Sequence, residues 1–397
     1  MFWDGVTGRV HSLTAVAGAG KTRWIVSEIK SAIDDGVNPY DILAISYTRK
    51  SSAELGNRIY KVVGNSRVSA STIHSAAWRV VKSCWPDAQI ASEDFLASQL
   101  IERLDCSRSE ALALVAEAST WLECGGLPGQ WWPHPSFRKF PQNLRVDQVA
   151  EAMEQSLNER VSRKLFGYSD LLAVAYKVAS RAPSLIYVDE AQDLSPFQAL
   201  LVRRWAELGA TVWLVGDCEQ SIYGFRGADP NYLASVTDNM SLVHNHRSGS
   251  AIVEVGSALR SDGLEMLPAP RAASGRVQVF EHKNFNELSD YVTVMQNNAL
   301  NAGVGSQVLV RTQDEKRHLP TALTIHQAKG LEWPIVHVAG FCNGRLPSKL
   351  ALTPEEVAEE RRLAYVGVTR ARDVLVLHTI KDRPSPFMNL LPRWVVE

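Results

Sequence analysis

The stretch AVAGAGKT, at residues 15–22, decides the fold of this chain. It follows a short apolar run and places two glycines close before Lys21 and Thr22, where a helical pattern begins. Glycine lets a backbone turn tightly around phosphates and point its N–H groups at them. The stretch therefore predicts a phosphate-binding loop, with Lys21 on the β- and γ-phosphates of a nucleotide and the Thr22 hydroxyl on Mg²⁺. The general phosphate-binding pattern, GxxxxGK(S/T), begins with a glycine, and this chain has Ala15 at that position.

A second stretch, LIYVDEAQD at residues 185–193, supports this interpretation. Four apolar residues end in Asp189 and Glu190, which is the pattern of a buried strand that delivers two carboxylates to its carboxyl end. One carboxylate can hold a metal ion, and the other can orient the water that attacks a phosphate. The alternative is an ordinary glycine turn and an unrelated acidic loop.

Charge, cysteine content and apolar patterning argue against a strongly basic protein, a disulfide-rich protein and a membrane protein. The chain has 397 residues, enough for two or three domains, and its 42 basic and 43 acidic residues nearly cancel. A nucleic-acid partner must therefore be met by a local groove. The five cysteines lack CxxC spacing, which favours a reducing compartment without disulfides or structural zinc. The sequence has no signal-peptide pattern and no apolar run of about 18 residues, so we expect a soluble, cytoplasmic protein with no membrane partner.

Apolar runs alternate with helical patterns through most of the chain, which predicts an α/β fold with parallel sheets. We expect strands at residues 10–16, 41–47, 68–74, 185–188, 211–215, 241–244, 277–280, 307–310 and 374–378. We expect helices at residues 21–33, 75–82, 197–207, 285–300 and 355–372. Between residues 84 and 166 the rhythm changes to helical patterns at 93–104, 108–121 and 146–164, with a loop rich in proline and aromatics at 127–144. This change predicts a helical insertion of roughly 80 residues.

Eight sequence blocks occur in the order found in one family. They are the phosphate-binding loop, YTRKSSAEL, STIHSAAWRVV, VDEAQD, VGDCEQSIYGFRGA, NHRS, TIHQAKGLEW and EERRLAYVGVTRAR. From residue 13 to residue 377 the chain resembles the UvrD/Rep-like branch of superfamily 1 DNA helicases. The resemblance implies two RecA-like P-loop motor domains, with ATP in the cleft between them and single-stranded DNA crossing both. It places the first motor at residues 1–84 and 166–240, the helical insertion at 85–165, and the second motor at 241–397.

The resemblance also assigns a nucleotide site. Phosphate and magnesium contacts fall to Gly18, Ala19, Gly20, Lys21, Thr22 and Asp189, with Thr22 and Asp189 as the metal ligands. Glu190 is expected to be the general base, Gln220 the sensor of the γ-phosphate, and Glu332 a neighbour of the sugar and triphosphate. Arg247 and Arg370 are expected to neutralise charge on the γ-phosphate, an effect worth ~10³–10⁵ in rate. For these arginines, as for Arg226, the alternative is a surface salt bridge.

The same resemblance predicts a path for single-stranded DNA. In the first motor it runs past Tyr47, Thr48, Arg49, Ile73, His74, Tyr223 and Phe225, and in the second past Arg311, Thr312, His326 and Lys329. Aromatic rings suit a motor that ignores sequence, because every base offers a face for stacking, worth roughly 1–3 kcal/mol per base. For Tyr47 a place in the core is the alternative. Phe225 follows Gly224 in a polar loop, which favours stacking.

Two departures from the family pattern alter the expected adenine site. The family has a glutamine upstream of the phosphate-binding loop, and this chain has none before Gln89. His246 stands where the family has a tyrosine beside the base, and it can still stack. A third departure concerns size. Only residues 313–323 separate VLVRT from TIHQAKGLEW, which is too short for the insertion that larger relatives carry in the second motor.

We therefore expect an ATP-dependent helicase or translocase that moves 3′→5′ on single-stranded DNA and acts at junctions of single and double strands. For duplex contact it should depend on residues 131–140 of the first insertion, or on a protein partner. One alternative is a DNA-stimulated ATPase that displaces proteins without separating strands. Another is a nucleic-acid-binding scaffold with an inactive nucleotide site.

Overall fold

The computed structural model describes residues 2–64, 67–125, 140–141 and 143–396. Contacts within the chain divide it into two compact units, which are described separately below. The first unit comprises Met1–Ser12, Thr22–Gly216 and Tyr223–Asn239. The second comprises Leu13–Lys21, Asp217–Ile222 and Met240–Glu397, so the phosphate-binding loop is grouped with the carboxyl-terminal part of the chain.

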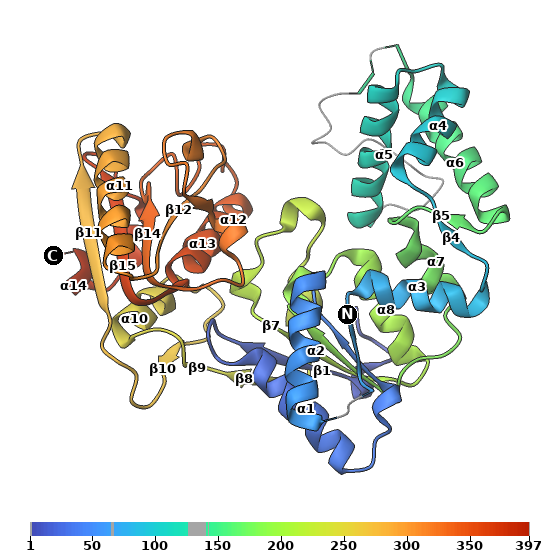
Figure 1. Cartoon of the computed structure of the whole chain (residues 1–397), viewed down its shortest axis with the longest axis horizontal. Coiled ribbons are helices and arrows are strands. Elements are labelled where there is room, and N and C mark those ends of the chain that lie inside the picture. The colour runs from blue at the N-terminus through green and yellow to red at the C-terminus, as the bar shows by residue number, and fades with distance from the viewer. Residues whose placement is uncertain (1, 65–66, 126–139, 142, 397) are drawn as a thin grey trace. The chain divides into compact units, whose positions relative to one another are not determined.

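A six-stranded sheet with the order β3-β2-β6-β7-β1-β8 is the framework of the amino-terminal half (Figure 1). Its strands are β1 (Val10–Ala15), β2 (Ile42–Ile45), β3 (Ser69–Ser71), β6 (Leu185–Asp189), β7 (Thr211–Gly216) and β8 (Asn239–Leu242). The pairs β2–β3, β2–β6 and β6–β7 are parallel. Every residue of β2 is buried, as expected for an apolar strand covered on both faces.

Helices follow these strands and carry several of the quoted motifs. They are α1 (Lys21–Asp34), α2 (Arg49–Val63), α3 (Ile73–Cys84), α7 (Asp170–Val178), α8 (Pro196–Glu207) and α9 (Asn231–Ala234). Thr48 and Thr72 are the N-caps of α2 and α3, and each hydroxyl accepts a hydrogen bond from a backbone N–H of the first turn. Both motifs that follow β2 and β3 therefore begin at fixed helix ends.

The helical insertion has a core of its own. It contains α4 (Glu93–Leu104), α5 (Arg108–Glu123) and α6 (Val146–Ser162), and a short parallel pair, β4 (Gln89–Ile90) with β5 (Leu165–Phe166). Leu100, Leu114 and Val149 lie in one buried cluster that joins the three helices. Figure 1 shows these helices side by side. Of residues 131–140, which we expected to contact duplex, only Phe140 is among the described residues.

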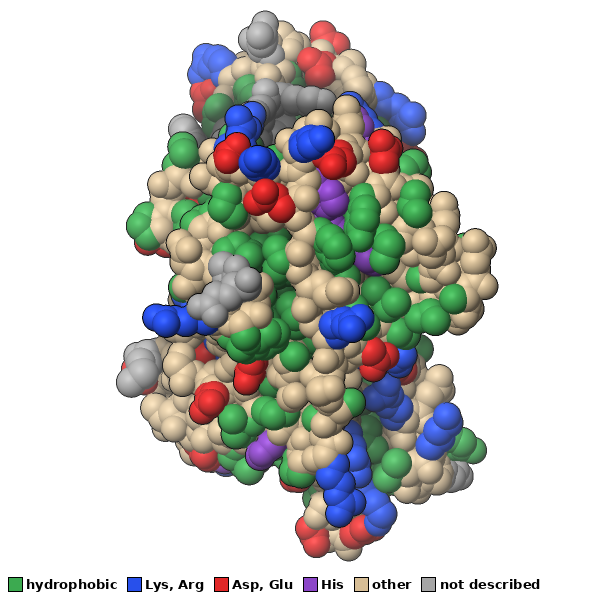
Figure 2. Space-filling view, turned by 90° about the vertical axis from the view of Figure 1, so that its left-hand side faces the viewer, with side chains coloured by type: hydrophobic (Ala, Val, Ile, Leu, Met, Phe, Trp, Pro, Cys, Tyr) green, Lys and Arg blue, Asp and Glu red, His purple; other side chains and the backbone are tan. Residues whose placement is uncertain are grey.

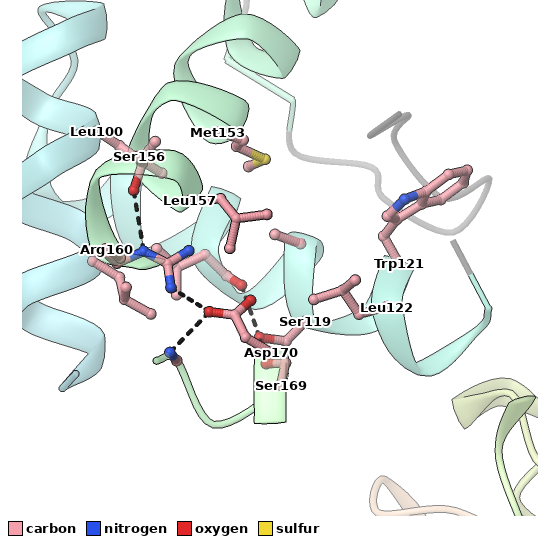
Figure 3. Close-up of a pocket in the computed structure, with 14 residues that line it drawn as sticks. Leu100, Ser119, Trp121, Leu122, Met153, Ser156, Leu157, Arg160, Ser169 and Asp170 are labelled. Atoms are coloured by element: carbon pink, nitrogen blue, oxygen red, sulfur yellow. Dashed lines mark hydrogen bonds and ion pairs between the residues drawn. The ribbon is translucent and has the colours of Figure 1, made fainter. Parts of the chain in front are cut away.

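One buried ion pair ties the insertion to the helix that follows it. Arg160 on α6 pairs with Asp170 at the start of α7, and Asp170 also accepts a hydrogen bond from the Gly167 N–H at 2.8 Å. The Arg160 Nε donates to the Ser156 hydroxyl at 3.4 Å. These side chains line a cavity of about 80 Å³ whose other walls are mainly apolar (Figure 3).

The second unit contains a parallel sheet with the order β11-β15-β14-β12-β13. Its strands are β11 (Arg276–His282), β12 (Ser306–Val310), β13 (Leu323–Thr324), β14 (Trp333–Ala339) and β15 (Ala371–Ile380), and β9 (His244–Asn245) pairs with β10 (Leu267–Pro268) separately. The helices are α10 (Ser250–Ala258), α11 (Phe285–Asn301), α12 (Ile325–Ala328), α13 (Pro354–Val368) and α14 (Arg393–Val396). Between β12 and β13 the chain forms only a 3-10 turn, η6 (Glu315–Arg317).

Three buried histidines form a hydrogen-bonded row across this sheet. His378 on β15 is bonded to His282 on β11 through its Nδ1 and to His337 on β14 through its Nε2, each at 3.0 Å. Burial lowers the pKa of His337 to about 4 and lowers the pKa of His282. It lowers the pKa of His378 as well, with a smaller contribution from the charges of the two neighbouring rings. The row is therefore neutral in the folded protein at pH 7.

The α/β fold with parallel sheets is confirmed. One predicted helix was too long: the pattern at 355–372 forms α13 only to Val368, and residues from Ala371 onward pair with β14 instead. On the face in Figure 2, acidic and basic side chains are mixed, in keeping with the balanced composition. Among the residues that the structure describes, none of the helices combines the length and apolarity needed to cross a bilayer.

Candidate nucleotide and nucleic-acid site

The phosphate-binding loop connects β1 to α1, and two of its residues have the positive φ angles that glycine adopts readily. Gly18 and Gly20 have φ angles of +70° and +87°. A Cβ atom on Gly18 would lie 2.8 Å from the Cβ of Arg247 and 2.9 Å from Oδ1 of Asn245. Position 18 therefore needs glycine for two reasons: the backbone angle, and the close packing of the NHRS motif against the loop.

The loop fits the phosphates of ATP. Two residues with positive φ, followed by the first turn of a 14-residue helix, supply the concave set of N–H groups that binds anions. Lys21 is the first residue of α1 and Thr22 the second, so both stand at the helix end that favours negative charge. Ala19, between the two glycines, donates its N–H to the Val16 carbonyl at 3.1 Å, which closes the turn.

The NHRS motif is folded around one buried amide. Oδ1 of Asn245 accepts the N–H groups of Arg247 and Ser248 at 2.7 and 2.8 Å. The His246 N–H donates to the Gly18 carbonyl at 2.9 Å, while the histidine side chain is exposed. The guanidinium of Arg247 pairs with Glu332. Four residues that we expected at the nucleotide therefore meet within the second unit: Gly18, His246, Arg247 and Glu332.

Gln220 and Arg370 also lie together in this unit. The Nη2 of Arg370 donates to Oε1 of Gln220 at 3.4 Å, and Lys329 donates to the Gln220 backbone carbonyl at 2.7 Å. Arg370 is only 1% exposed, so it is a core side chain and not half of a surface salt bridge. Lys329 was expected on the DNA path, and here it contacts the residue expected to sense the γ-phosphate.

The acidic pair stands at the carboxyl end of β6 in the first unit. The Glu190 N–H donates to Oδ1 of Asp189 at 3.0 Å, and Glu190 has a left-handed backbone with φ of +56°. The fully buried Gln192 donates its amide to Oε2 of Glu190 at 2.6 Å. Carboxylate and hydroxyl oxygens are the ligands that Mg²⁺ prefers, so Asp189 and Thr22 suit that ion. Gln192 was absent from our expected site, although it stands inside the quoted DEAQD motif.

Aromatic rings gather in the first unit near this pair. The rings of Tyr47 and Tyr223 are stacked, with centroids 5.5 Å apart and an interplanar angle of 5°. Phe225 is 57% exposed and meets Tyr223 edge-on. The guanidinium of Arg226 lies over both rings of the YGF segment, 5.9 Å from Tyr223 and 5.6 Å from Phe225. Tyr47 is 37% exposed, so the core is not its place, and Arg226 is a neighbour of the aromatic rings.

A cavity of about 220 Å³ joins the aromatic residues to the acidic ones within the first unit. Its walls include Tyr47, Ile73, His74, Tyr168, Asp189, Glu190 and Arg226. The His74 ring is stacked on Tyr168 at 4.4 Å, and burial lowers the pKa of His74 to about 4. His74 is therefore neutral at pH 7, and its ring is stacked within the protein. Tyr168, which we did not predict, belongs to the same wall.

Of the remaining expected DNA contacts, Arg311 and Thr312 form hydrogen bonds within the protein. Arg311 makes a double hydrogen bond to the buried Glu360, with Nε and Nη2 at 2.9 and 2.6 Å from Oε1. The Thr312 N–H donates to Oε2 of Glu315 at 2.9 Å. His326 lies on α12, and Arg49 is exposed at the start of α2. The structure thus fixes Arg311 by a buried carboxylate, whereas Arg49 faces solvent.

Two family models match the chain. The UvrD/REP helicase N-terminal domain matches residues 6–241, and the UvrD-like helicase C-terminal domain matches residues 321–382. A protein of Mycoplasma pneumoniae named "Probable DNA helicase" is 25% identical over 446 residues, covering 97% of this chain and 84% of that protein. The ATP-dependent DNA helicase PcrA of Staphylococcus epidermidis is 25% identical over 317 residues. That match covers 70% of this chain and 42% of PcrA, so the chain spans less than half the length of that relative.

Solved structures of viral helicases show a weaker similarity. Arterivirus nonstructural protein 10 (helicase) gives a TM-score of 0.49 at 16% identity, over 98% of this chain and 63% of that one. The PRRSV helicase gives 0.46 at 13% identity, over 95% and 54%. These scores are too low to add to what the family models show.

Proposed function

Because the chain belongs to the UvrD/REP helicase family, we propose that it is an ATP-dependent DNA helicase that moves 3′→5′ on single-stranded DNA. The observation that carries the nucleotide part is the packing of Gly18 against Arg247. A phosphate-binding loop is pressed against the arginine that the family pattern assigns to the γ-phosphate. That pairing suits phosphoryl transfer, in which positioning and charge neutralisation supply most of the catalysis.

Each side chain has a role in this proposal. The N–H groups of the loop and Lys21 bind the phosphates, and Glu190 accepts the proton of the attacking water. Gln192 orients Glu190, since it donates to that carboxylate at 2.6 Å. Arg247 and Arg370 neutralise the charge that develops on the transferred group. Mg²⁺, held by Thr22 and Asp189, would supply further charge neutralisation.

On the DNA side, the stacked pair Tyr47–Tyr223 and the exposed Phe225 support a sequence-independent grip on bases. Junctions of single and double strands are the substrate that unwinding requires. The chain between β12 and β13 holds only the turn η6, which supports a second motor without a further insertion. We therefore propose low processivity for the monomer and a protein partner that raises it.

The test is ATP hydrolysis and strand separation on 3′-tailed, 5′-tailed and blunt duplexes. We expect hydrolysis stimulated by single strands and unwinding of the 3′-tailed substrate alone. Lys21→Ala and Glu190→Gln are the inactive controls, and Glu190→Gln should still bind nucleotide. Stimulated hydrolysis without unwinding would favour a DNA-dependent ATPase that displaces proteins. Hydrolysis by Glu190→Gln at the wild-type rate would show that another group is the base.

A further inference from the structure

A fully buried polar network lies beside Gln220 in the second unit. Its centre is the carboxylate of Asp217, which has no exposed surface. Three side chains donate to this carboxylate: Gln220 through Nε2 at 2.7 Å, Arg260 through Nη1 at 3.0 Å, and Tyr365 through its hydroxyl at 3.0 Å. A buried carboxylate is stable only when such partners satisfy it, so the four side chains form one unit of structure.

The hydroxyl of Tyr365 connects this network to the phosphate-binding loop. It accepts the backbone N–H of Ala17 at 3.0 Å and Nη1 of Arg260 at 2.7 Å, and it donates to Asp217. A hydroxyl has one donor and two acceptor positions, so the full capacity of this group is used. Ala17 directly precedes Gly18, which means that a single oxygen atom joins the loop backbone to the carboxylate that holds Gln220.

The amide of Gln220 is held in one orientation. Its Nε2 faces the Asp217 carboxylate at 2.7 Å, and its Oε1 faces the Arg370 guanidinium at 3.4 Å. The flipped amide would place oxygen against a carboxylate and nitrogen against a cation, so the charges on both sides select this orientation. Asp217 therefore decides where the donor of Gln220 points.

Burial and charge in the network raise the pKa values of Tyr365 and Arg260. Burial, followed by the Asp217 charge, raises the pKa of the Tyr365 hydroxyl. Burial disfavours the charge on Arg260, but Asp217 and the neighbouring Asp262 outweigh it and raise its pKa. Tyr365 is thus a neutral donor and Arg260 a cation at pH 7.

We propose that Tyr365 and Asp217 are positioning residues, which set Gln220 for ATP hydrolysis and couple its placement to the backbone of the phosphate-binding loop. This inference rests on the proposed function, because it takes Gln220 as the residue that contacts the γ-phosphate. Tyr365 and Asp217 need not touch the nucleotide themselves. They act through Gln220, and their loss should therefore affect the rate of hydrolysis more than the binding of nucleotide.

A double-mutant cycle on DNA-stimulated ATP hydrolysis tests the proposal, using Tyr365→Phe, Gln220→Ala and the combined variant in the full chain. Tyr365→Phe removes one oxygen atom, and we expect kcat to fall about tenfold while KM for ATP stays within about twofold. We expect the combined variant to be no slower than Gln220→Ala alone, because both changes remove the same function. Asp217→Asn, which keeps the side-chain shape, gives a second cycle with the same expected sign.

Tyr291→Phe is the matched control, since Tyr291 lies on α11 against the histidine row and outside the network. It should leave kcat unchanged. A Tyr365→Phe protein with wild-type kcat would overturn the inference, and so would a combined variant in which the two rate losses multiply. Absence of DNA-stimulated hydrolysis in the wild-type protein would instead overturn the proposed function, and the inference with it.

Discussion

The Nε atom of Arg247 lies 2.5 Å from Oε2 of Glu332. The two groups form an ion pair, and the buried Nε atom has no hydrogen-bond partner. Nη1 of the same guanidinium donates to the Thr369 carbonyl at 3.4 Å. The arginine that packs on Gly18 is therefore held by a carboxylate from the TIHQAKGLEW motif, and two segments that the sequence separates by 85 positions hold one charge.

Substitutions of Arg247 and Glu332 should lower kcat by different amounts. Arg247→Ala should lower DNA-stimulated kcat by ~10³, the effect of losing an arginine from phosphoryl transfer. Glu332→Gln keeps the cation but releases its orientation, so we expect a smaller loss of about tenfold. Steady-state hydrolysis gives the loss of kcat for each variant, and ADP binding is measured separately. Glu54→Gln removes the partner of Arg58 in an exposed pair and should change nothing. A fully active Glu332→Gln protein would contradict the orienting role.

Phe225→Ala should weaken the grip on single-stranded DNA and leave ATP binding intact. The ring is 57% exposed and lies beneath the Arg226 guanidinium, so little core packing is lost. We expect affinity for an oligonucleotide to fall about tenfold, the value of one stacked base. Fluorescence anisotropy measures it. Unchanged affinity, with unchanged translocation, would remove Phe225 from the DNA path.

Asp170→Ala should destabilise the protein by about 3–5 kcal/mol, because it leaves the buried Arg160 without its carboxylate. The matched control is Asp94→Ala, which breaks the exposed Arg108 pair and should cost less than about 1 kcal/mol. Urea unfolding of both variants gives the two free energies. Equal losses would show that the pair in Figure 3 is not energetically important.

The histidine row should make the protein sensitive to mild acid. Its pKa values are lowered in the folded state, whereas an unfolded histidine has a pKa of about 6.5. Below pH 6.5 the unfolded chain therefore binds protons that the folded chain does not, and stability falls as the pH drops toward 4. Groups facing the row are the Tyr291 ring and, near His282, the Glu287 carboxylate.

The measurement is the difference in unfolding free energy between pH 7.5 and pH 5.5 for wild type and His378→Phe. The variant should lose part of that difference, at most about 1.4 kcal/mol per pH unit for each group. His244→Asn, at an exposed position, is the control. An identical pH dependence in His378→Phe would show that other groups, such as His74, account for the acid sensitivity.

Nucleotide choice should be broad. The exposed His246 side chain stands where the family has a tyrosine. The backbone N–H of His246 donates to the Gly18 carbonyl. With phosphate contacts dominating the site, we expect ATP, GTP and CTP to be hydrolysed with kcat/KM values within about tenfold of each other. A preference for ATP of several hundredfold would show that another residue reads the base.

The sequence predicted the parts of the site that are local. The loop before Lys21 and the strand before Asp189 follow from apolar runs that end in glycine or acid, and α4 has the bounds that its spacing predicted. Relationships across the fold could not be obtained in this way. Of the three histidines in the row, only His378 falls in an expected strand; His282 lies just beyond the strand expected at 277–280, and no strand was expected at His337. Nothing in the sequence pattern says that the three strands are neighbours.

Buried polar side chains were the other class that sequence reasoning missed. Tyr365 stands in the apolar run LAYVGV and Asp217 directly after β7. In each of these two motifs the sequence pattern pointed to another residue, Arg370 in the first and Gln220 in the second. The partners of Tyr365 and Asp217 are Arg260, which lies two residues beyond the end of α10, and the Ala17 backbone in the phosphate-binding loop. A polar residue inside an apolar run is a signal of a buried network, but its partners appear only in three dimensions.

The chain passes from one unit to the other after Ser12, Lys21, Gly216, Ile222 and Asn239. Each unit is therefore built from three separate segments of the chain, and no single peptide-bond cleavage releases either of them whole. A fragment that starts at Met240 lacks the phosphate-binding loop, and one that ends at Asn239 retains that loop and Asp217–Ile222 but loses the long segment that begins at Met240. To isolate either unit, its three segments would have to be rejoined by new links, because neither unit is one continuous piece of the chain.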